Sequence, residues 1–93
     1  MEEIGIQVIK YSVKPAPVLV GRFGNDPEKK TVLIYAHYDV KPAGERKLWH
    51  SDPFVPTVRD GKVYARGSAD NKSPLMAHLK ALEYFVRKKW KFP

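Results

Sequence analysis

The sequence contains no cysteine, and this absence excludes several kinds of chemistry. Without a thiol, the chain has no disulfide framework, no thiolate zinc site and no cysteine nucleophile. Any metal ion must therefore be bound by histidine, aspartate or glutamate side chains. Histidine itself is scarce, because only His37, His50 and His78 are present.

Long hydrophobic runs are also absent. No apolar stretch approaches the roughly 20 residues that a membrane-spanning helix needs. The first residues, MEEIGIQ, are acidic and lack the basic and apolar regions of a secretory signal peptide. We therefore expect a soluble, cytoplasmic protein with no membrane partner.

Acidic residues are too few to balance the basic ones. The chain has 93 residues, enough for one small domain or part of one, and 17 Lys and Arg against 10 Asp and Glu give a formal charge of +7. Such a charge attracts polyanions. Part of the excess lies in the terminal RKKWKF, residues 87–92, where basic residues are also favoured by the macrodipole at the end of a helix. We favour the helix end, and nucleic acid is not an expected partner.

Four segments have the pattern of β-strands or hairpins. Residues 4–10 alternate apolar and polar side chains, and residues 17–23 are rich in β-branched ones. TVLIYA, residues 31–36, is a near-continuous apolar run, which is typical of a central strand covered on both faces. In residues 57–65, the Asp-Gly pair is a strong hairpin signal because it tolerates the positive φ angles of a type I′ turn.

The end of the chain predicts an amphipathic helix over residues 73–90. Its apolar positions recur at helical spacing, at Leu75, Leu79, Leu82 and Val86. Asp70, Asn71 or Ser73 could cap this helix, and Pro74 suits its first turn. Together these elements predict an α/β fold in which a mixed β-sheet packs against the amphipathic helix.

The loop of residues 37–54 begins with a candidate functional motif. His37 and Asp39 follow the predicted central strand, at the edge where open α/β sheets gather their ligands. On an extended segment the two side chains point to the same side, so Asp39 could accept a hydrogen bond from the imidazole N–H that faces away from a metal ion. An isolated His-x-Asp motif is more often a polar strand end without a function.

Asp70 is the second candidate. It precedes the predicted helix and follows YARGSA, residues 64–69, where glycine and small residues permit a sharp turn. A carboxylate at this position could bridge two metal ions. It could equally cap the helix, which is the commonest role of an aspartate there.

Residues 31–84, which contain both candidates, resemble the co-catalytic zinc exopeptidases and deacylases. This family includes aminoacylase, acetylornithine deacetylase, succinyl-diaminopimelate desuccinylase, glutamate carboxypeptidase and carnosine dipeptidase. The resemblance covers about residues 17–86 and depends on the strand-His-x-Asp signature and on RGSADNK, residues 66–72. The segment LWHSDPFVPTVRDGKVYARGSADNK, residues 48–72, is most similar to the dipeptidase-like branch.

The resemblance implies a role for each candidate residue. His37 becomes a ligand of one zinc ion, Asp39 the group that orients its imidazole, and Asp70 the carboxylate that bridges two zinc ions, with cobalt or manganese as alternative metals. It also implies a cis peptide bond after Asp70. His50 and His78 match no ligand of the family, and we assign them to the structure, His50 through hydrogen bonds of its loop.

The sequence departs from the family pattern at three positions close to these residues. Asn71 and Ser73 stand where the family usually has Asp and Gly, and Ala36 replaces a frequent Gly before the histidine. The fine geometry of the site and its metal affinity are therefore not implied by the resemblance.

The resemblance also implies that residues 1–93 form only part of a metallopeptidase catalytic domain. The opening helix, the lid or dimerisation domain, the glutamate base and the other metal ligands have no counterpart here. We therefore expect a fragment of a zinc-dependent hydrolase that cleaves peptide or N-acyl amino acid amide bonds with metal-activated water, and that is inactive without the remainder of its domain. A homo-oligomer is compatible with this interpretation. The alternative is a non-catalytic, basic small domain that binds a protein or a polyanion.

Overall fold

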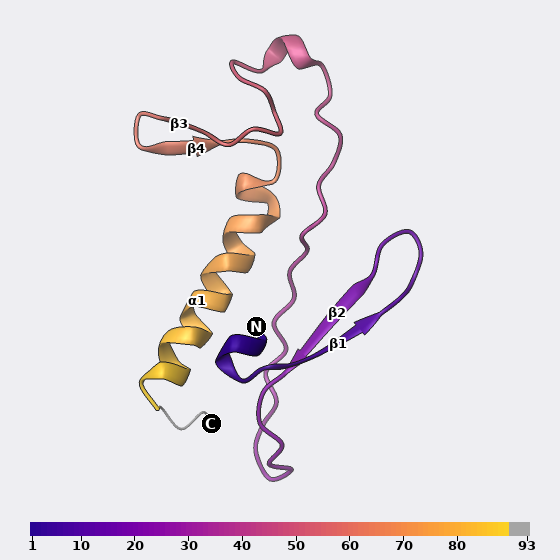
Figure 1. Ribbon diagram of the computed structural model, residues 1–93, viewed down its shortest axis with the longest axis vertical. Helices are drawn as coiled ribbons and strands as arrows, with labels where there is room; N and C mark the ends of the chain where they lie inside the picture. The colour runs from indigo at the N-terminus through magenta and orange to yellow at the C-terminus, as the bar shows by residue number, and fades with distance from the viewer. Residues whose placement is uncertain (90–93) are drawn as a thin grey trace. The chain divides into compact units, whose positions relative to one another are not determined.

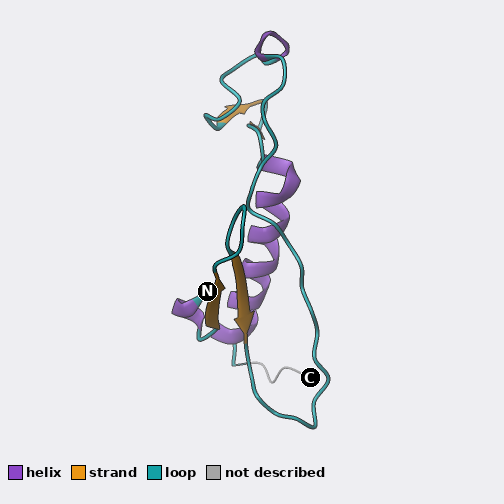
Figure 2. Cartoon of the chain, turned by 90° about the vertical axis from the view of Figure 1, so that its right-hand side faces the viewer, coloured by secondary structure: helices purple, strands orange, loops and turns teal. Residues whose placement is uncertain are grey.

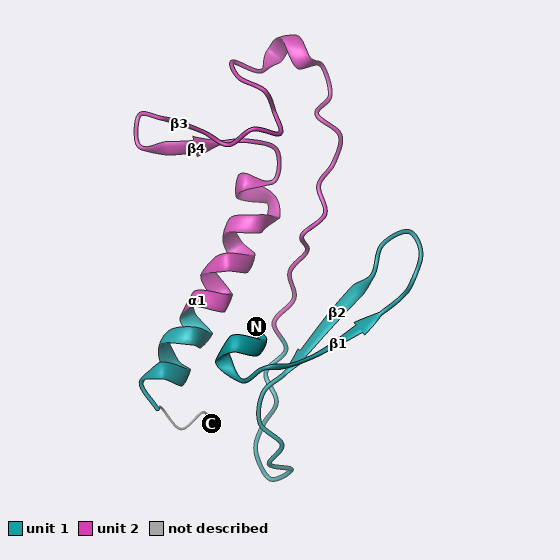
Figure 3. Ribbon diagram, in the orientation of Figure 1, with its two compact units in different colours: residues 1–33, 81–93 teal, residues 34–80 magenta. Residues whose placement is uncertain are grey.

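The computed structural model describes residues 1–89, which fall into two compact units (Figure 3). Unit 1 contains residues 1–33 and the segment from residue 81 onward, and unit 2 contains residues 34–80. The elements follow one another as η1 (Glu2–Ile4), β1 (Gln7–Tyr11), β2 (Val18–Arg22), η2 (Arg46–Leu48), β3 (Thr57–Arg59), β4 (Lys62–Tyr64), η3 (Ser68–Lys72) and α1 (Ser73–Arg87) (Figure 1). The predicted combination of β-strands with one amphipathic helix is confirmed. Within the described part, no helix is long and apolar enough to cross a membrane.

Unit 1 contains the first antiparallel hairpin, β1–β2. Its register runs from Gln7 opposite Arg22 to Tyr11 opposite Val18. Ile6, just before β1, is 6 % exposed and is the one large hydrophobic side chain that is buried among residues 1–89. Gly21 makes this burial possible, because a Cβ at this position would lie 2.8 Å from Ile6 Cγ2. The strands predicted over 4–10 and 17–23 are confirmed, with ends that differ from the prediction by one to three residues.

Unit 2 contains the second hairpin, β3–β4. Val58 lies opposite Val63, and the turn is made by Asp60 and Gly61, whose φ angles are 49° and 69°. Both angles are positive, as a type I′ turn requires. The hairpin predicted from the Asp-Gly pair is therefore confirmed.

Residues 31–36 differ from the prediction. They are extended, but the stretch from residue 23 to residue 45 contains neither helix nor strand (Figure 2). Val32, Leu33 and Tyr35 are 75 %, 89 % and 82 % exposed. A strand needs neighbouring backbone to complete its hydrogen bonds, and none of the strands in residues 1–89 pairs with this segment. The expectation that residues 31–36 form the central strand of the sheet is therefore wrong for this chain.

Helix α1 (Ser73–Arg87) starts at the predicted residue and has Pro74 in its first turn. The predicted end at Trp90 lies outside the described residues. Its predicted apolar positions are partly buried, whereas Ala77, His78 and Tyr84 are exposed. The apolar stripe is therefore the less exposed side of the helix, as its spacing predicts.

Candidate metal centre

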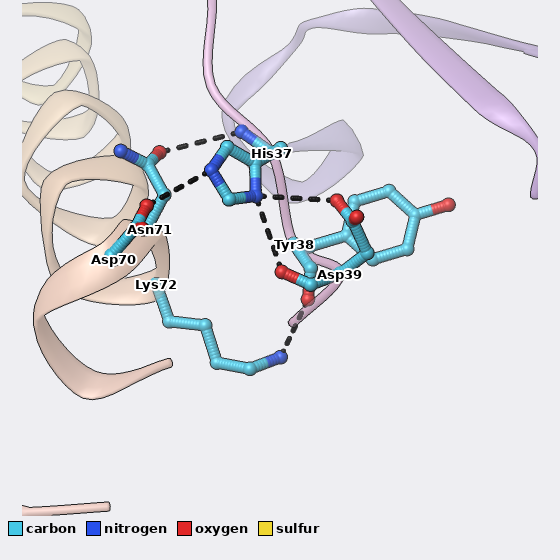
Figure 4. Close-up of polar contacts among 6 residues, drawn as sticks. All are labelled: His37, Tyr38, Asp39, Asp70, Asn71 and Lys72. Atoms are coloured by element: carbon cyan, nitrogen blue, oxygen red, sulfur yellow. Dashed lines mark hydrogen bonds and ion pairs between the residues drawn. The ribbon is translucent and has the colours of Figure 1, made fainter. Parts of the chain in front are cut away.

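Two short segments of unit 2, far apart in the sequence, meet at the candidate site (Figure 4). Residues 37–39 belong to the extended stretch, and residues 70–72 belong to η3 (Ser68–Lys72), the π-turn that leads into α1. Nε2 of His37 lies 3.0 Å from Oδ1 of Asp70. The resemblance requires these side chains to lie within about 5 Å of each other, and this expectation is confirmed.

The other side of the imidazole faces Asp39. Nδ1 of His37 lies 3.1 Å from the backbone oxygen of Asp39 and 3.2 Å from its Oδ1. A carbonyl and a carboxylate oxygen only accept hydrogen bonds, so a proton on Nδ1 satisfies both of these contacts at once. Asp39 thus contacts His37 in the way predicted for an orienting group.

This arrangement leaves two acceptors facing each other. When Nδ1 holds the single proton of a neutral imidazole, Nε2 presents a lone pair, and the Asp70 carboxylate that it faces also accepts. A separation of 3.0 Å between two acceptors is favourable only with a cation between them. Either a second proton on His37 or a metal ion meets this need.

The pKa of His37 is raised, because its surroundings stabilise the positively charged imidazolium. The hydrogen bond to the backbone carbonyl of Asp39 is the largest cause that raises it above the ordinary value of 6.5. Partial burial of the ring opposes this shift, while the hydrogen bond to Asp70 and the charges of both aspartates add to it. The site therefore favours a cation at Nε2.

The His37–Asp70 pair fits part of a zinc site. Two ligand atoms that each lie about 2.0–2.2 Å from one tetrahedral ion are roughly 3.3–3.6 Å apart, so a widening by a few tenths of an ångström would admit the ion. The side chains are 35 % and 86 % exposed, which leaves the pair accessible. Among residues 1–89, however, no group of three or more His, Cys, Asp or Glu side chains is placed to hold a metal ion. The described residues therefore fit an incomplete site.

Two neighbours of Asp70, which the sequence did not identify as site residues, also contact the histidine segment. Oδ1 of Asn71 accepts a hydrogen bond from the backbone N–H of His37 at 3.3 Å. Nζ of Lys72 donates to the backbone oxygen of Tyr38 at 2.8 Å. The peptide bond between Asp70 and Asn71 is cis, as the resemblance implies. The side chains of Asp70 and Asn71 thus bind the segment of His37, and neither makes a capping hydrogen bond to α1.

The other two histidines lie apart from the pair. His50 is exposed and, with Arg59 and Tyr64, lines an open cavity of about 300 Å³. The hydrogen bonds expected for His50 within its loop are absent from the described chain. His78 is exposed on α1. Neither residue joins His37 and Asp70, as the sequence predicted.

Comparison with known proteins places this geometry in a family. The model of Peptidase family M20/M25/M40 matches residues 33–93. Cys-Gly metallodipeptidase DUG1 of Candida albicans is 40 % identical over an alignment that covers 100 % of this chain and 20 % of its own length. Human Beta-Ala-His dipeptidase is 46 % identical over 74 % of this chain and 14 % of its own length.

A solved structure agrees with these matches. The crystal structure of human carnosine dipeptidase 1 matches 97 % of this chain with a TM-score of 0.79 and 32 % identity, and the match covers 21 % of that protein. This chain therefore spans about a fifth, or less, of the length of these relatives. Since the family match includes the segments of both His37 and Asp70, the chain belongs to Peptidase family M20/M25/M40.

Proposed function

We propose that this chain provides part of the metal-binding site of a zinc-dependent hydrolase that cleaves dipeptide-like substrates. Amides of N-acyl amino acids are the second substrate class compatible with the resemblance. The facing acceptors His37 Nε2 and Asp70 Oδ1, 3.0 Å apart, are the observation that supports the proposal. The names of the relatives, which are dipeptidases, support the substrate class.

Each of the three residues has a separate task in this function. His37 would bind a zinc ion through Nε2, and Asp70 would provide the carboxylate shared by two zinc ions. Asp39 keeps the proton of the imidazole on Nδ1, so that Nε2 remains free to bind. Bound zinc supplies a Lewis acid that polarises the substrate carbonyl and lowers the pKa of water to about 7.

The described residues are too few for catalysis. A catalytic zinc site has about three protein ligands and a base that receives the proton of the water, whereas this chain provides two candidate ligands. We propose that the remaining ligands and a glutamate base come from polypeptide outside residues 1–93. The chain alone should therefore bind zinc weakly and hydrolyse no peptide.

A calorimetric zinc titration tests the metal site. The His37→Ala and Asp70→Ala variants should lose whatever specific affinity the chain has, because each removes one of two ligands. His50→Ala is the matched control and should bind like the unaltered chain. Equal zinc affinity in the chain and in His37→Ala would contradict the assignment, and so would zinc-dependent hydrolysis that survives in His37→Ala.

A chimaera tests the hydrolase function. Residues 17–86 would replace the aligned segment of the Candida albicans Cys-Gly metallodipeptidase, and hydrolysis of Cys-Gly and β-Ala-His would be measured. The chimaera should cleave at least one dipeptide, and the substitutions His37→Ala and Asp70→Ala should abolish turnover while His50→Ala retains it. Turnover that persists in both of the first two variants would rule out the proposed roles.

A further inference from the structure

The histidine and aspartate segments are joined by more than the contact between His37 and Asp70. Residues 70, 71 and 72 contact residues 37 and 38 in order, through Asp70 to the imidazole, Asn71 to the N–H of His37, and Lys72 to the oxygen of Tyr38. We infer that Asn71 and Lys72 are positioning residues, whose side chains hold the backbone of His37 at the distance that brings Nε2 to Asp70. Their relevance to zinc depends on the proposed function, but the positioning itself does not.

The geometry explains why two such contacts are needed. In a sheet, the ladder of hydrogen bonds would fix the strand that precedes His37, but residues 31–36 pair with no strand of the described chain. Asn71 accepts a hydrogen bond from the backbone N–H of His37, and Lys72 donates one to the backbone C=O of Tyr38. These two groups lie at the two ends of the dipeptide formed by residues 37 and 38. Both contacts together restrict the backbone that directs the imidazole.

The charge of Lys72 makes its role testable, because a charge effect and a positioning effect change cation affinity in opposite directions. No carboxylate of residues 1–89 forms an ion pair with its ammonium group, which instead makes a charge-assisted bond to the Tyr38 carbonyl. If only its charge mattered, Lys72→Met would strengthen cation binding, because a nearby positive charge repels a metal ion. If positioning dominates, the same substitution weakens cation binding.

Asn71 allows a complementary pair of substitutions. Asn71→Asp keeps an oxygen that accepts from the N–H of His37 and adds negative charge, whereas Asn71→Leu has a similar size but no acceptor. Positioning therefore predicts that Asn71→Asp preserves the site and that Asn71→Leu disrupts it. Lys72→Arg keeps a donor and should rescue the defect of Lys72→Met.

The decisive experiment measures the ring nitrogens of His37 by ¹⁵N NMR in the metal-free 93-residue chain. At about pH 9, well above the ordinary imidazole pKa of about 6.5, the spectrum reports which nitrogen carries the proton. His37 should have its proton on Nδ1, unlike the exposed His50 and His78, which are internal references. This difference should be lost in Asn71→Leu and Lys72→Met and kept in Asn71→Asp and Lys72→Arg.

Matched controls are the exposed Asn25→Leu and Lys62→Met, which should leave His37 unchanged. The helical circular dichroism of α1 verifies that each variant retains its fold.

A His37 spectrum in the unaltered chain that equals those of His50 and His78 would overturn the inference, and so would an unchanged spectrum in both Asn71→Leu and Lys72→Met. Zinc titration of the same samples separates the two proposals. Absent zinc binding with the predicted spectra would refute the metal function alone, and tighter zinc binding by Lys72→Met would refute positioning alone.

Discussion

Gly67→Ala should separate the two segments of the site, because Gly67 lies against the histidine segment. A Cβ at Gly67 would lie 2.4 Å from Cγ1 of Val40. Carbon atoms in contact are about 3.5–4.0 Å apart, so residue 40 or residue 67 would have to move by more than about 1 Å. We expect such a movement to lengthen at least one of the His37–Asp70, His37–Asn71 and Lys72–Tyr38 contacts, which are 2.8–3.3 Å long.

The free-energy cost has two parts that a control can separate. The φ angle of Gly67 is 87°, a conformation that costs an alanine roughly 1–2 kcal/mol. The steric overlap adds about 1–3 kcal/mol. Gly44 has a φ angle of 73° but no heavy atom within 4 Å of its added Cβ, so Gly44→Ala bears the first cost alone.

Calorimetric zinc titration is the assay. Gly67→Ala should weaken zinc binding by about 10- to 100-fold, the effect typical of a displaced supporting group. Gly44→Ala should bind like the unaltered chain, and the double variant Gly67→Ala/Val40→Ala should recover most of the loss because Cγ1 is gone. Equal affinities of Gly67→Ala and Gly44→Ala would refute the reasoning, since the overlap would then have no effect on the site.

Three further predictions concern pH, the exposed apolar segment and an ion pair. Zinc affinity should fall as pH decreases through the pKa of His37, which is raised above 6.5, because a proton then competes with zinc for Nε2. Zinc titrations at several pH values test this. Asp39→Asn keeps the backbone carbonyl that is the largest cause of the shift, so it should move the midpoint only part of the way back. The chain should bind an apolar dye and self-associate, and Leu33→Lys should reduce both in fluorescence and sedimentation assays, unlike Ile6→Val, because Leu33 is 89 % exposed. Asp52→Asn should lower the stability of the η2 loop near neutral pH and make it less sensitive to acid, followed by circular dichroism, because the Phe54 N–H and Arg46 lower the pKa of Asp52 and this stabilising contribution is lost as pH falls through that lowered value.

The local elements were predictable because their signals lie within a few residues. Asp60 and Gly61 specify a turn by their own tolerance of positive φ, and the spacing of Leu75, Leu79 and Leu82 specifies a helix without reference to any other segment. Residues 31–36 were mispredicted for the opposite reason. Their apolar composition is typical of a strand that pairs with other strands and is covered on both faces. The described chain contains no strand that pairs with them.

The candidate site was only partly predictable. The pairing of His37 with Asp70 came from the resemblance, since neither residue alone distinguishes a ligand from a strand end or a helix cap. Asn71 and Lys72 were missed because each contacts backbone atoms of residues 37 and 38. Any sequence provides such atoms, so no pattern of side chains marks the contact.

The contact of His37 with Asp70 also closes a loop, since the two residues lie 33 positions apart and residues between them include η2 and the β3–β4 hairpin. Any ion that binds both residues acts on the unfolded chain as a cross-link does, and a cross-link across about 33 residues removes entropy equivalent to roughly 3.7 kcal/mol. With such an ion bound, a chain without cysteine would gain the constraint that a disulfide provides, in a form that a chelator reverses. Because doubling such a loop adds only about 0.6 kcal/mol to its closure, insertions in residues 41–45, which precede η2, should be tolerated, whereas inserting one residue beside His37 or Asp70 should not.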